Sequence, residues 1–256
     1  MKKLLFILLL WNLFSYSAHA DPLKLVALQY PPYVYAEEGE IKGIATQMIR
    51  AIFDELEVEI DIEVLPWARA LRALKYKTAD GVFTIFKTKE RLAFLDYPNQ
   101  PLIDQRISIY VRQDSSIEFS GDLEPLYPHR IALTRSVSYG SVFDASRQNF
   151  VNSITVNDEI SKFDLLAIGR TELLISNQDA AEYYIEKLGL VGKFRRLTPA
   201  LESVPSYLAL TRSPKHRALL ERFEQVLNRF KSSGQLHQIN KRSLASGKPS
   251  APELRF

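Results

Sequence analysis

The sequence predicts an α/β fold in which helices pack against a mostly parallel sheet. From residue 23 to residue 98, short apolar runs alternate with stretches of helical periodicity in the order β-α-β-α-β, which favours parallel strands covered by helices. Two further extended runs, 107–112 and 204–211, bracket an inner segment from Asp114 to Pro205 that repeats strand, helix, strand, helix by itself. About 236 residues follow the N-terminal apolar segment, enough for one large domain or two smaller ones. The pattern predicts the fold class and leaves the number of domains open.

Residues 1–20 have the three-part pattern of a secretory signal peptide. Two lysines open the segment, residues 4–13 are almost wholly apolar, and Ala18-His19-Ala20 offers small residues around a cleavage point. The apolar part is too short to cross a bilayer as a helix, although an uncleaved anchor is the alternative. No later segment approaches the roughly 20 apolar residues that a membrane helix needs. We therefore expect cleavage after Ala20, export, and no membrane span in the mature chain.

The composition is that of an ordinary globular protein and excludes several functions. The full chain carries a net charge of +3, and loss of Lys2 and Lys3 with the signal leaves about +1. A basic surface for nucleic acid has no support in so balanced a chain. There are no cysteines, so thiol chemistry, disulfides and cysteine-based zinc sites are excluded, and stability has to come from the hydrophobic core.

The first predicted strand, 23–28, leads into a rigid loop. This loop, Tyr30-Pro31-Pro32-Tyr33, has its backbone restricted by two prolines and carries two tyrosines. A turn at 37–39 follows, and after Gly43 apolar residues recur at helical spacing as far as Leu56. Because tyrosine combines an apolar ring with a polar tip, the two side chains suit either the edge of the core or stacking on a ligand.

A second predicted strand, 59–65, precedes a helix opened by Pro66-Trp67, where proline is favoured and Trp67 suits either the core or a ligand platform. A third strand, Val82–Phe86, is followed by the polar run that contains Arg91. Open α/β sheets present ligand groups just past the ends of their strands, and a guanidinium can hold a carboxylate through two hydrogen bonds. The alternative is that Arg91 is a solvated surface charge, as most arginines are.

The segments YPPYVY, GEIKGIATQMIRAIFDEL, the helix opened by PW, and DGVFTIFKTKERLAFLDYP together resemble family 3 of the bacterial extracellular solute-binding proteins. This family contains the periplasmic amino-acid-binding proteins of ATP-driven importers and their relatives. Further similar segments lie at 107–112, 130–138, 156–184, 204–211 and 219–239, so the resemblance covers essentially the whole mature chain. Each motif is loose, but their order and spacing together are fairly specific.

The resemblance implies a type II periplasmic binding fold: two α/β lobes, each a mostly parallel sheet flanked by helices, joined by two crossover strands. Residues 21–110 with 206–245 would form the first lobe, 111–205 the second, and 246–256 a mobile tail. A small-molecule ligand would lie in the cleft and favour closure of the lobes by contacting both. We expect a periplasmic monomer that serves an inner-membrane ABC-type permease.

The resemblance also implies the residues of the ligand site. Arg91 matches the arginine that holds the ligand's α-carboxylate in the family, and Ser138 matches a hydroxyl residue that reaches the same group from the second lobe. Tyr30, Tyr33 and Trp67 match apolar walls of the site. The remaining implied residues are Thr84 and Phe86, whose register is uncertain because the spacing from Asp80 to Arg91 is one residue short, and Arg135 and Tyr139, which flank Ser138.

One residue departs from the pattern of amino-acid binders. Where they carry an aspartate that pairs with the ligand's ammonium, the aligned residue is Asn177. A neutral amide cannot neutralise a buried cation, and leaving one unpaired is costly. Asp179 would take the role only if the register slipped by two residues. We therefore expect a small polar or anionic organic molecule, an amino acid or a related compound, and Asn177 favours an anionic or neutral ligand over an ordinary α-amino acid.

Other functions have weaker support. The four histidines are scattered without metal-ligand spacing, there is no glycine-rich phosphate loop, and the serine-rich run at 136–141 lacks a nucleophile elbow, so we expect no metal, cofactor or catalytic residue. An enzyme similar to cyclohexadienyl dehydratase is one alternative, provided that Glu90 or Asp179 turns into the cleft as a general acid. A free ligand-sensing subunit for a signalling partner is the other.

Overall fold

A computed structural model describes residues 21–236, 238 and 239; the expected signal peptide and C-terminal tail lie outside these residues. The strands are β1 Leu23–Ala27, β2 Tyr35–Glu37, β3 Glu40–Lys42, β4 Ile60–Val64, β5 Gly81–Phe86, β6 Leu95–Asp96, β7 Ile103–Arg112, β8 Ile131–Thr134, β9 Ser153–Val156, β10 Leu173–Asn177, β11 Phe194–Arg196 and β12 Glu202–Thr211. The helices are α2 Ile44–Glu55, α3 Trp67–Lys75, α4 Ser141–Ser146, α5 Glu159–Ala167, α6 Gln178–Lys187 and α7 Pro214–Ser232, with short 3₁₀ turns at Arg91–Ala93, Glu124–Leu126 and Arg147–Asn149. No helix in this part of the chain is both long and apolar enough to cross a membrane.

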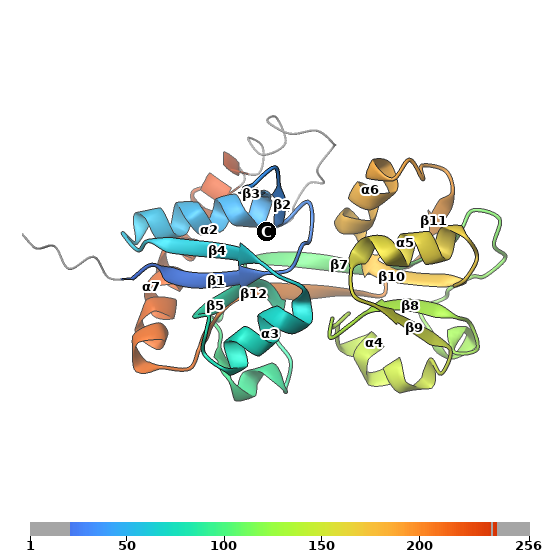
Figure 1. Ribbon diagram of the computed structural model, residues 1–256, viewed down its shortest axis with the longest axis horizontal. Helices are drawn as coiled ribbons and strands as arrows, with labels where there is room; N and C mark the ends of the chain where they lie inside the picture. Colours follow the sequence, from blue (N-terminus) through green and yellow to red (C-terminus); the bar gives the residue numbers. More distant parts are fainter. Residues whose placement is uncertain (1–20, 237, 240–256) are drawn as a thin grey trace, which may run out of the picture.

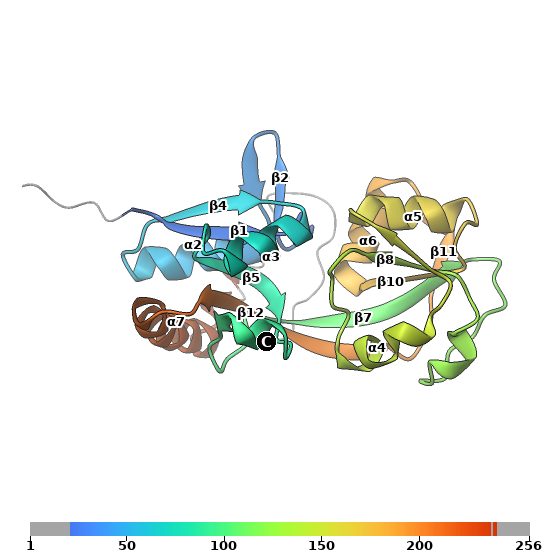
Figure 2. The ribbon, with the colours of Figure 1, turned by 60° about the horizontal axis from the view of Figure 1, so that its bottom comes forward.

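The elements form two lobes connected by the long strands β7 and β12 (Figure 1). The first lobe contains β1, β4, β5 and β12 with helices α2, α3 and α7. The second contains β8, β9 and β10 with helices α4, α5 and α6, and the view in Figure 2 shows the same separation. The predicted two-lobe α/β fold is therefore confirmed.

The strands follow one hydrogen-bonded path in the order β4-β1-β5-β12-β7-β10-β8-β9. Within the first lobe β1 pairs in parallel with β4 and β5, and within the second lobe β8 pairs in parallel with β9 and β10. β12 pairs antiparallel with β5 and β7, and β7 pairs antiparallel with β10. Each lobe thus has a mostly parallel sheet, and the only strands that connect the two sheets along this path are the antiparallel pair β7 and β12.

The apolar residues of helix α2, which recur at helical spacing in the sequence, form part of the core of the first lobe. Its apolar positions recur three and four residues apart, and Met48, Ile52 and Phe53 are fully buried. Phe53 packs against Phe223 of α7, with ring centroids 5.7 Å apart. Two helices far apart in the sequence therefore bury one apolar interface, and burial of side chains of this size stabilises a core by roughly 1.5–3 kcal/mol each.

The start of α2 fixes the Tyr30–Tyr33 loop that reaches the space between the lobes. The backbone N–H of Ile44 donates to Pro32 O (3.0 Å), and that of Ala45 donates to Tyr33 O (2.9 Å). Gly43, just before the helix, has φ of +116°, and a Cβ there would lie 2.3 Å from Tyr33 O. Only glycine allows this approach, because both the backbone conformation and the lack of space disfavour a side chain.

Gly43→Ala is expected to lower the free energy of unfolding by at least about 2 kcal/mol, because it combines a positive φ with a clash against backbone atoms. Gly39 is the matched control: its φ is +81°, but a Cβ added there would have no other atom within 4 Å. Gly39→Ala should therefore cost only about 1 kcal/mol. Urea denaturation of both variants measures the difference, and equal costs would contradict the close-approach argument.

Candidate functional site

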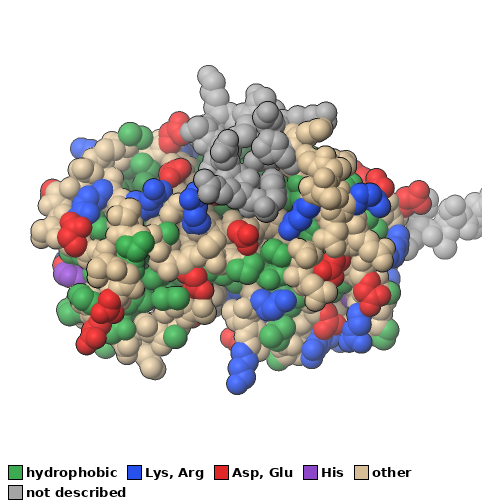
Figure 3. Space-filling view, turned by 180° about the vertical axis from the view of Figure 1, so that it is seen from behind, with side chains coloured by type: hydrophobic (Ala, Val, Ile, Leu, Met, Phe, Trp, Pro, Cys, Tyr) green, Lys and Arg blue, Asp and Glu red, His purple; other side chains and the backbone are tan. Residues whose placement is uncertain are grey.

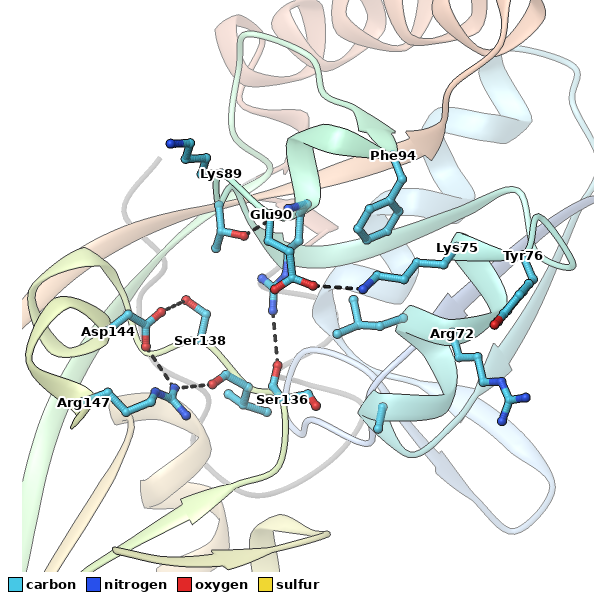
Figure 4. Close-up of a pocket in the computed structure, with 15 residues that line it drawn as sticks. Arg72, Lys75, Tyr76, Lys89, Glu90, Phe94, Ser136, Ser138, Asp144 and Arg147 are labelled. Carbon is cyan, nitrogen blue, oxygen red and sulfur yellow. Dashed lines mark hydrogen bonds and ion pairs between the residues drawn. The ribbon is translucent and has the colours of Figure 1, made fainter. Parts of the chain in front are cut away.

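Two connected cavities lie where the lobes meet. The outer cavity has a volume of about 690 Å³ and is bounded by α3 and residues 88–94 of the first lobe and by residues 136–147 of the second. Figure 4 shows Lys75, Glu90 and Phe94 on one side of it and Asp144 and Arg147 on the other. The inner cavity, of about 40 Å³, is lined by Leu28, Tyr30, Trp67, Thr84, Phe86, Arg91, Gln105, Val137 and Ser138. Arg91, Val137 and Ser138 line both, so the two cavities adjoin at these residues.

Arg91 lies between the two cavities and is 6% exposed, so it is not a solvated surface charge. Its Nη1 donates to Phe86 O at the end of β5 (2.9 Å), and its Nη2 is 3.5 Å from Ser136 O in the second lobe. The guanidinium also lies 5.4 Å from the centroid of the Trp67 ring, a favourable position for a cation over an aromatic face. The end of a buried strand thus presents this side chain where the fold was expected to present it.

The carboxylates that line the outer cavity are paired with other cations. Glu90 pairs with Lys75 (2.9 Å) and Asp144 pairs with Arg147 (2.9 Å). Burial lowers the pKa of the Arg91 guanidinium, because the surroundings disfavour its charged form. Arginine stays charged in proteins even when it is buried. The hydrogen-bond partners of the Arg91 guanidinium are neutral carbonyl oxygens, which do not neutralise that charge. Such a group has unused capacity to bind an anion.

The loop after β8 in the second lobe contacts hydrogen-bond donors of the first lobe. The indole Nε1 of Trp67 donates to Ser136 O (3.0 Å), the same oxygen that Arg91 approaches. Ser136 has φ of +61°, an uncommon conformation for a residue with a side chain. Ser138, two residues later, lines both cavities and donates through its hydroxyl to Asp144. The lobes therefore touch at the Ser136 carbonyl.

Of the three expected aromatic walls, Tyr30 and Trp67 line the inner cavity. Tyr33 does not line either cavity but stacks on Tyr30, with ring centroids 5.4 Å apart. Its hydroxyl donates to Asp179 and lies 3.3 Å from Nδ2 of Asn177, both in the second lobe. Tyr33 thus forms a second contact between the lobes behind the aromatic wall.

Thr84 and Phe86 both line the inner cavity, although the spacing from Asp80 to Arg91 left their register open. Thr84 has φ of +60° and its hydroxyl donates to Phe83 O (2.6 Å). This kink falls within the bulge in the pairing of β5 with β12, between the pairs Val82–Ala209 and Ile85–Tyr207. The irregular strand end is therefore what turns both residues toward the cavity.

The structure does not bring Arg135 or Tyr139 to the cavities. Arg135 is exposed, and its Nε donates to Asn157 Oδ1 (3.0 Å), just past the end of β9. Tyr139 is buried, and its hydroxyl accepts hydrogen bonds from the Thr134 N–H (2.8 Å) and from Lys162 Nζ (3.3 Å). Both expectations rested only on adjacency to Ser138, and the reversal of the backbone at Ser136 sends these side chains elsewhere.

Asn177 lies at the end of β10 but is absent from the lining of both cavities. Its Oδ1 caps helix α6 by accepting from the Ala180 N–H (3.0 Å), a common role for asparagine at a helix start. Asp179, which accepts from Tyr33, does not line the cavities either. The position expected to meet a ligand ammonium is therefore occupied by a capping amide.

Several lining residues carried no recognisable signal in the sequence. Gln105 lies on β7, where residues 103, 105 and 107 are buried and their neighbours Asp104 and Arg106 are exposed. A glutamine among isoleucines on the buried face is the one feature that would have singled it out. Arg147 and the α3 residues Arg72 and Lys75 reach the outer cavity only because two lobes meet there, which no local pattern shows.

Comparison with known proteins finds one family and one fold that match most of the chain. The profile of the bacterial extracellular solute-binding proteins, family 3, matches residues 25–245. A comparison with curated proteins finds no match. A histidine kinase sensor domain with similarity to periplasmic binding proteins has 21% identity and a TM-score of 0.78, over 90% of this chain and 98% of that one. An ancestral arginine-binding protein bound to arginine has 20% identity and a TM-score of 0.74, over 87% and 98%. The arginine-, lysine-, histidine-binding protein ArtJ from the thermophilic bacterium Geobacillus stearothermophilus has 17% identity and a TM-score of 0.74, over 91% and 97%. At these identities the structural likeness shows a shared fold.

Asp179→Asn is expected to flatten the dependence of stability on pH. Burial raises the pKa of the Asp179 carboxyl above its ordinary value of 3.8, so the folded protein holds this proton more tightly than the unfolded chain. The resulting stabilisation is full below the ordinary pKa and is lost as pH rises through the raised value. Urea denaturation at several pH values between about 4 and 6 should show a smaller decline in the variant than in the wild type.

The control for this series is Asp164→Asn, which changes an exposed carboxylate on α5 of the same lobe. Its pH dependence should follow that of the wild type. If the stability of Asp179→Asn depends on pH in the same way as that of the wild type, burial does not raise the pKa of the Asp179 carboxyl as expected.

Proposed function

The chain belongs to family 3 of the bacterial extracellular solute-binding proteins, and we propose that it captures a small organic anion between its lobes in the periplasm, for delivery to an inner-membrane ABC-type importer. The observation that carries the choice of ligand is Arg91. It is 6% exposed, and the two carboxylates beside it, Glu90 and Asp144, are engaged by Lys75 and Arg147. A carboxylate from a solute would supply the bidentate partner that the protein itself does not.

The inner cavity favours a ligand without an ammonium group. None of its nine lining residues is acidic, and Asn177 faces the Tyr33 hydroxyl and the start of α6 instead. An α-amino acid bound here would bury its cation without a partner, a cost of several kcal/mol. An organic acid has no such group and meets Arg91 at its negative end.

The charge around the outer cavity favours anions as well. Five cationic side chains line it against two carboxylates, and two of the five are paired with these. The cationic residues that line the outer cavity are Arg72, Lys75, Lys89, Arg91 and Arg147. A cleft lined by an excess of one sign raises the local concentration of solutes of the opposite sign. Away from the cavity the face seen in Figure 3 has basic and acidic side chains interspersed.

Capture would involve a movement of the lobes. The inner cavity, about 40 Å³, is too small for an organic solute while the Ser136 carbonyl sits against Trp67 and Arg91. Separation of the lobes along β7 and β12 would release both donors, and a ligand that touches both lobes would then favour closure by its own contacts.

The carboxylates near the site support binding over catalysis. A general acid needs a raised pKa, but the hydrogen bond from Lys75 lowers the pKa of Glu90. Asp179, whose pKa burial raises, is occupied by the Tyr33 hydroxyl and lines neither cavity. Neither of these two carboxyl groups is therefore placed as the proton donor that the dehydratase alternative requires, and turnover of prephenate or arogenate by the purified protein would contradict the proposal.

Arg91→Ala is expected to weaken the binding of an organic acid at least about 30-fold, because truncating one partner of a buried charge pair costs roughly 2–5 kcal/mol. Isothermal titration calorimetry measures this with whichever acid stabilises the wild type most. The control is Arg50→Ala, which removes an exposed arginine from α2. Undiminished affinity in Arg91→Ala would remove the basis of the proposed site.

A thermal-shift screen tests the class of ligand. Short-chain and aromatic carboxylic acids should raise the melting temperature, and common L-amino acids should not. A ligand at 100 times its Kd adds about 2.7 kcal/mol of stability, so binding at accessible concentrations is measurable. Stabilisation by L-amino acids alone would show that the missing acidic partner does not matter and would overturn the proposed ligand class.

A further inference from the structure

Gln105, one of the residues that line the inner cavity, has an unused hydrogen-bond donor. The residue is completely buried, and its Nε2 has no partner among the described residues. Gln105 lines the inner cavity together with Arg91. A buried donor left unpaired is costly, and native structures seldom retain one without a use for it.

One end of the amide is engaged by Tyr30. The phenol of Tyr30 donates to Gln105 Oε1 (3.0 Å), so the other end of the amide, the Nε2 group, is the end left free. Burial raises the pKa of Tyr30 well above its ordinary value, which keeps the phenol neutral and able to donate. The backbone of Gln105 is held by the pairing of β7 with β12, opposite Val204. The donor is therefore fixed in position before any ligand arrives.

We propose that Gln105 Nε2 donates a hydrogen bond to an acceptor on the ligand, at the end away from the charge that Arg91 holds. Besides Arg91, Gln105 and the hydroxyl residues Thr84 and Ser138, the inner cavity is lined by aromatic and aliphatic side chains, which are Leu28, Tyr30, Trp67, Phe86 and Val137. The ligand class that fits is an organic anion with a flat or apolar body that carries a carbonyl, ether or ring-nitrogen acceptor. This inference rests on the proposed function, because it takes the anionic end of the ligand to be at Arg91.

Matched pairs of acids test the inference, each pair differing by one acceptor: isonicotinate against benzoate, and 4-oxopentanoate against pentanoate. Titration calorimetry of the wild type should show tighter binding of the acceptor-bearing member, by about 2- to 10-fold for one hydrogen bond. In Gln105→Met, which keeps the length of the side chain and removes the donor, the preference within each pair should disappear. Gln178→Met is the control, because that buried glutamine donates to Ser108 Oγ (2.8 Å) away from both cavities and should keep the preference.

The outcomes separate this inference from the function on which it rests. If both members of each pair bind the wild type equally and Arg91→Ala still abolishes binding, the role of Gln105 is wrong and the anion site stands. If none of the four acids binds the wild type, the proposed ligand class is wrong and this inference falls with it.

A stability measurement excludes a purely structural role for the amide. The double variant Tyr30→Phe/Gln105→Met removes both ends of the hydrogen bond, so no polar group is left without its partner. Its melting temperature without ligand should be equal to or above that of the wild type, since an unpaired buried donor is also lost. A clear drop would show that Gln105 serves the fold and would overturn the proposal.

Discussion

The structure of the site depends on one buried positive charge. Arg91 occupies the place where β5 ends, both lobes meet and both cavities join, and its guanidinium is held by carbonyl oxygens and an aromatic ring instead of a carboxylate. Those partners hold the side chain in position without neutralising it. The acidic residues nearby are paired with Lys75 and Arg147, so the surroundings isolate the charge as well as bury it. The proposed binding of an anion rests on that isolation more directly than on any motif.

The Ser136 carbonyl gives the closed arrangement its physical basis. It accepts from Trp67 and lies near Arg91, which are the first-lobe groups that a ligand would contact. A peptide carbonyl carries only a partial negative charge, so its contact with a guanidinium is weaker than that of a carboxylate. The second contact, between Tyr33 and the Asn177–Asp179 turn, lies farther back and lines neither cavity. Among the contacts between the lobes, the one at the Ser136 carbonyl is therefore the one that a carboxylate of a ligand would replace.

The sequence predicted the fold well because its signals are local. Helical spacing in α2, the Pro66-Trp67 helix start and the apolar run of β5 each depend on neighbours a few residues away. The placements of Arg135 and Tyr139 could not be predicted that way, because one residue with a positive φ reverses the chain beside them. The place of Gln105 in the cavity lining could not be predicted either, since the phenol that holds its amide lies 75 residues away in the chain. Side-chain direction at irregular turns and contacts between distant segments are tertiary properties.

The connection through β7 and β12 has a consequence for how the chain assembles as it is synthesised. The second-lobe strands β8, β9 and β10, together with β7 and β11 that extend their sheet, lie within residues 103–196, so that lobe can complete its sheet from one continuous stretch. The first lobe begins earlier but needs β12 beside β5 and α7 against α2, which arrive last. During translation the first lobe therefore starts before the second but is completed after it. Its apolar faces stay uncovered until β12 and α7 have been synthesised.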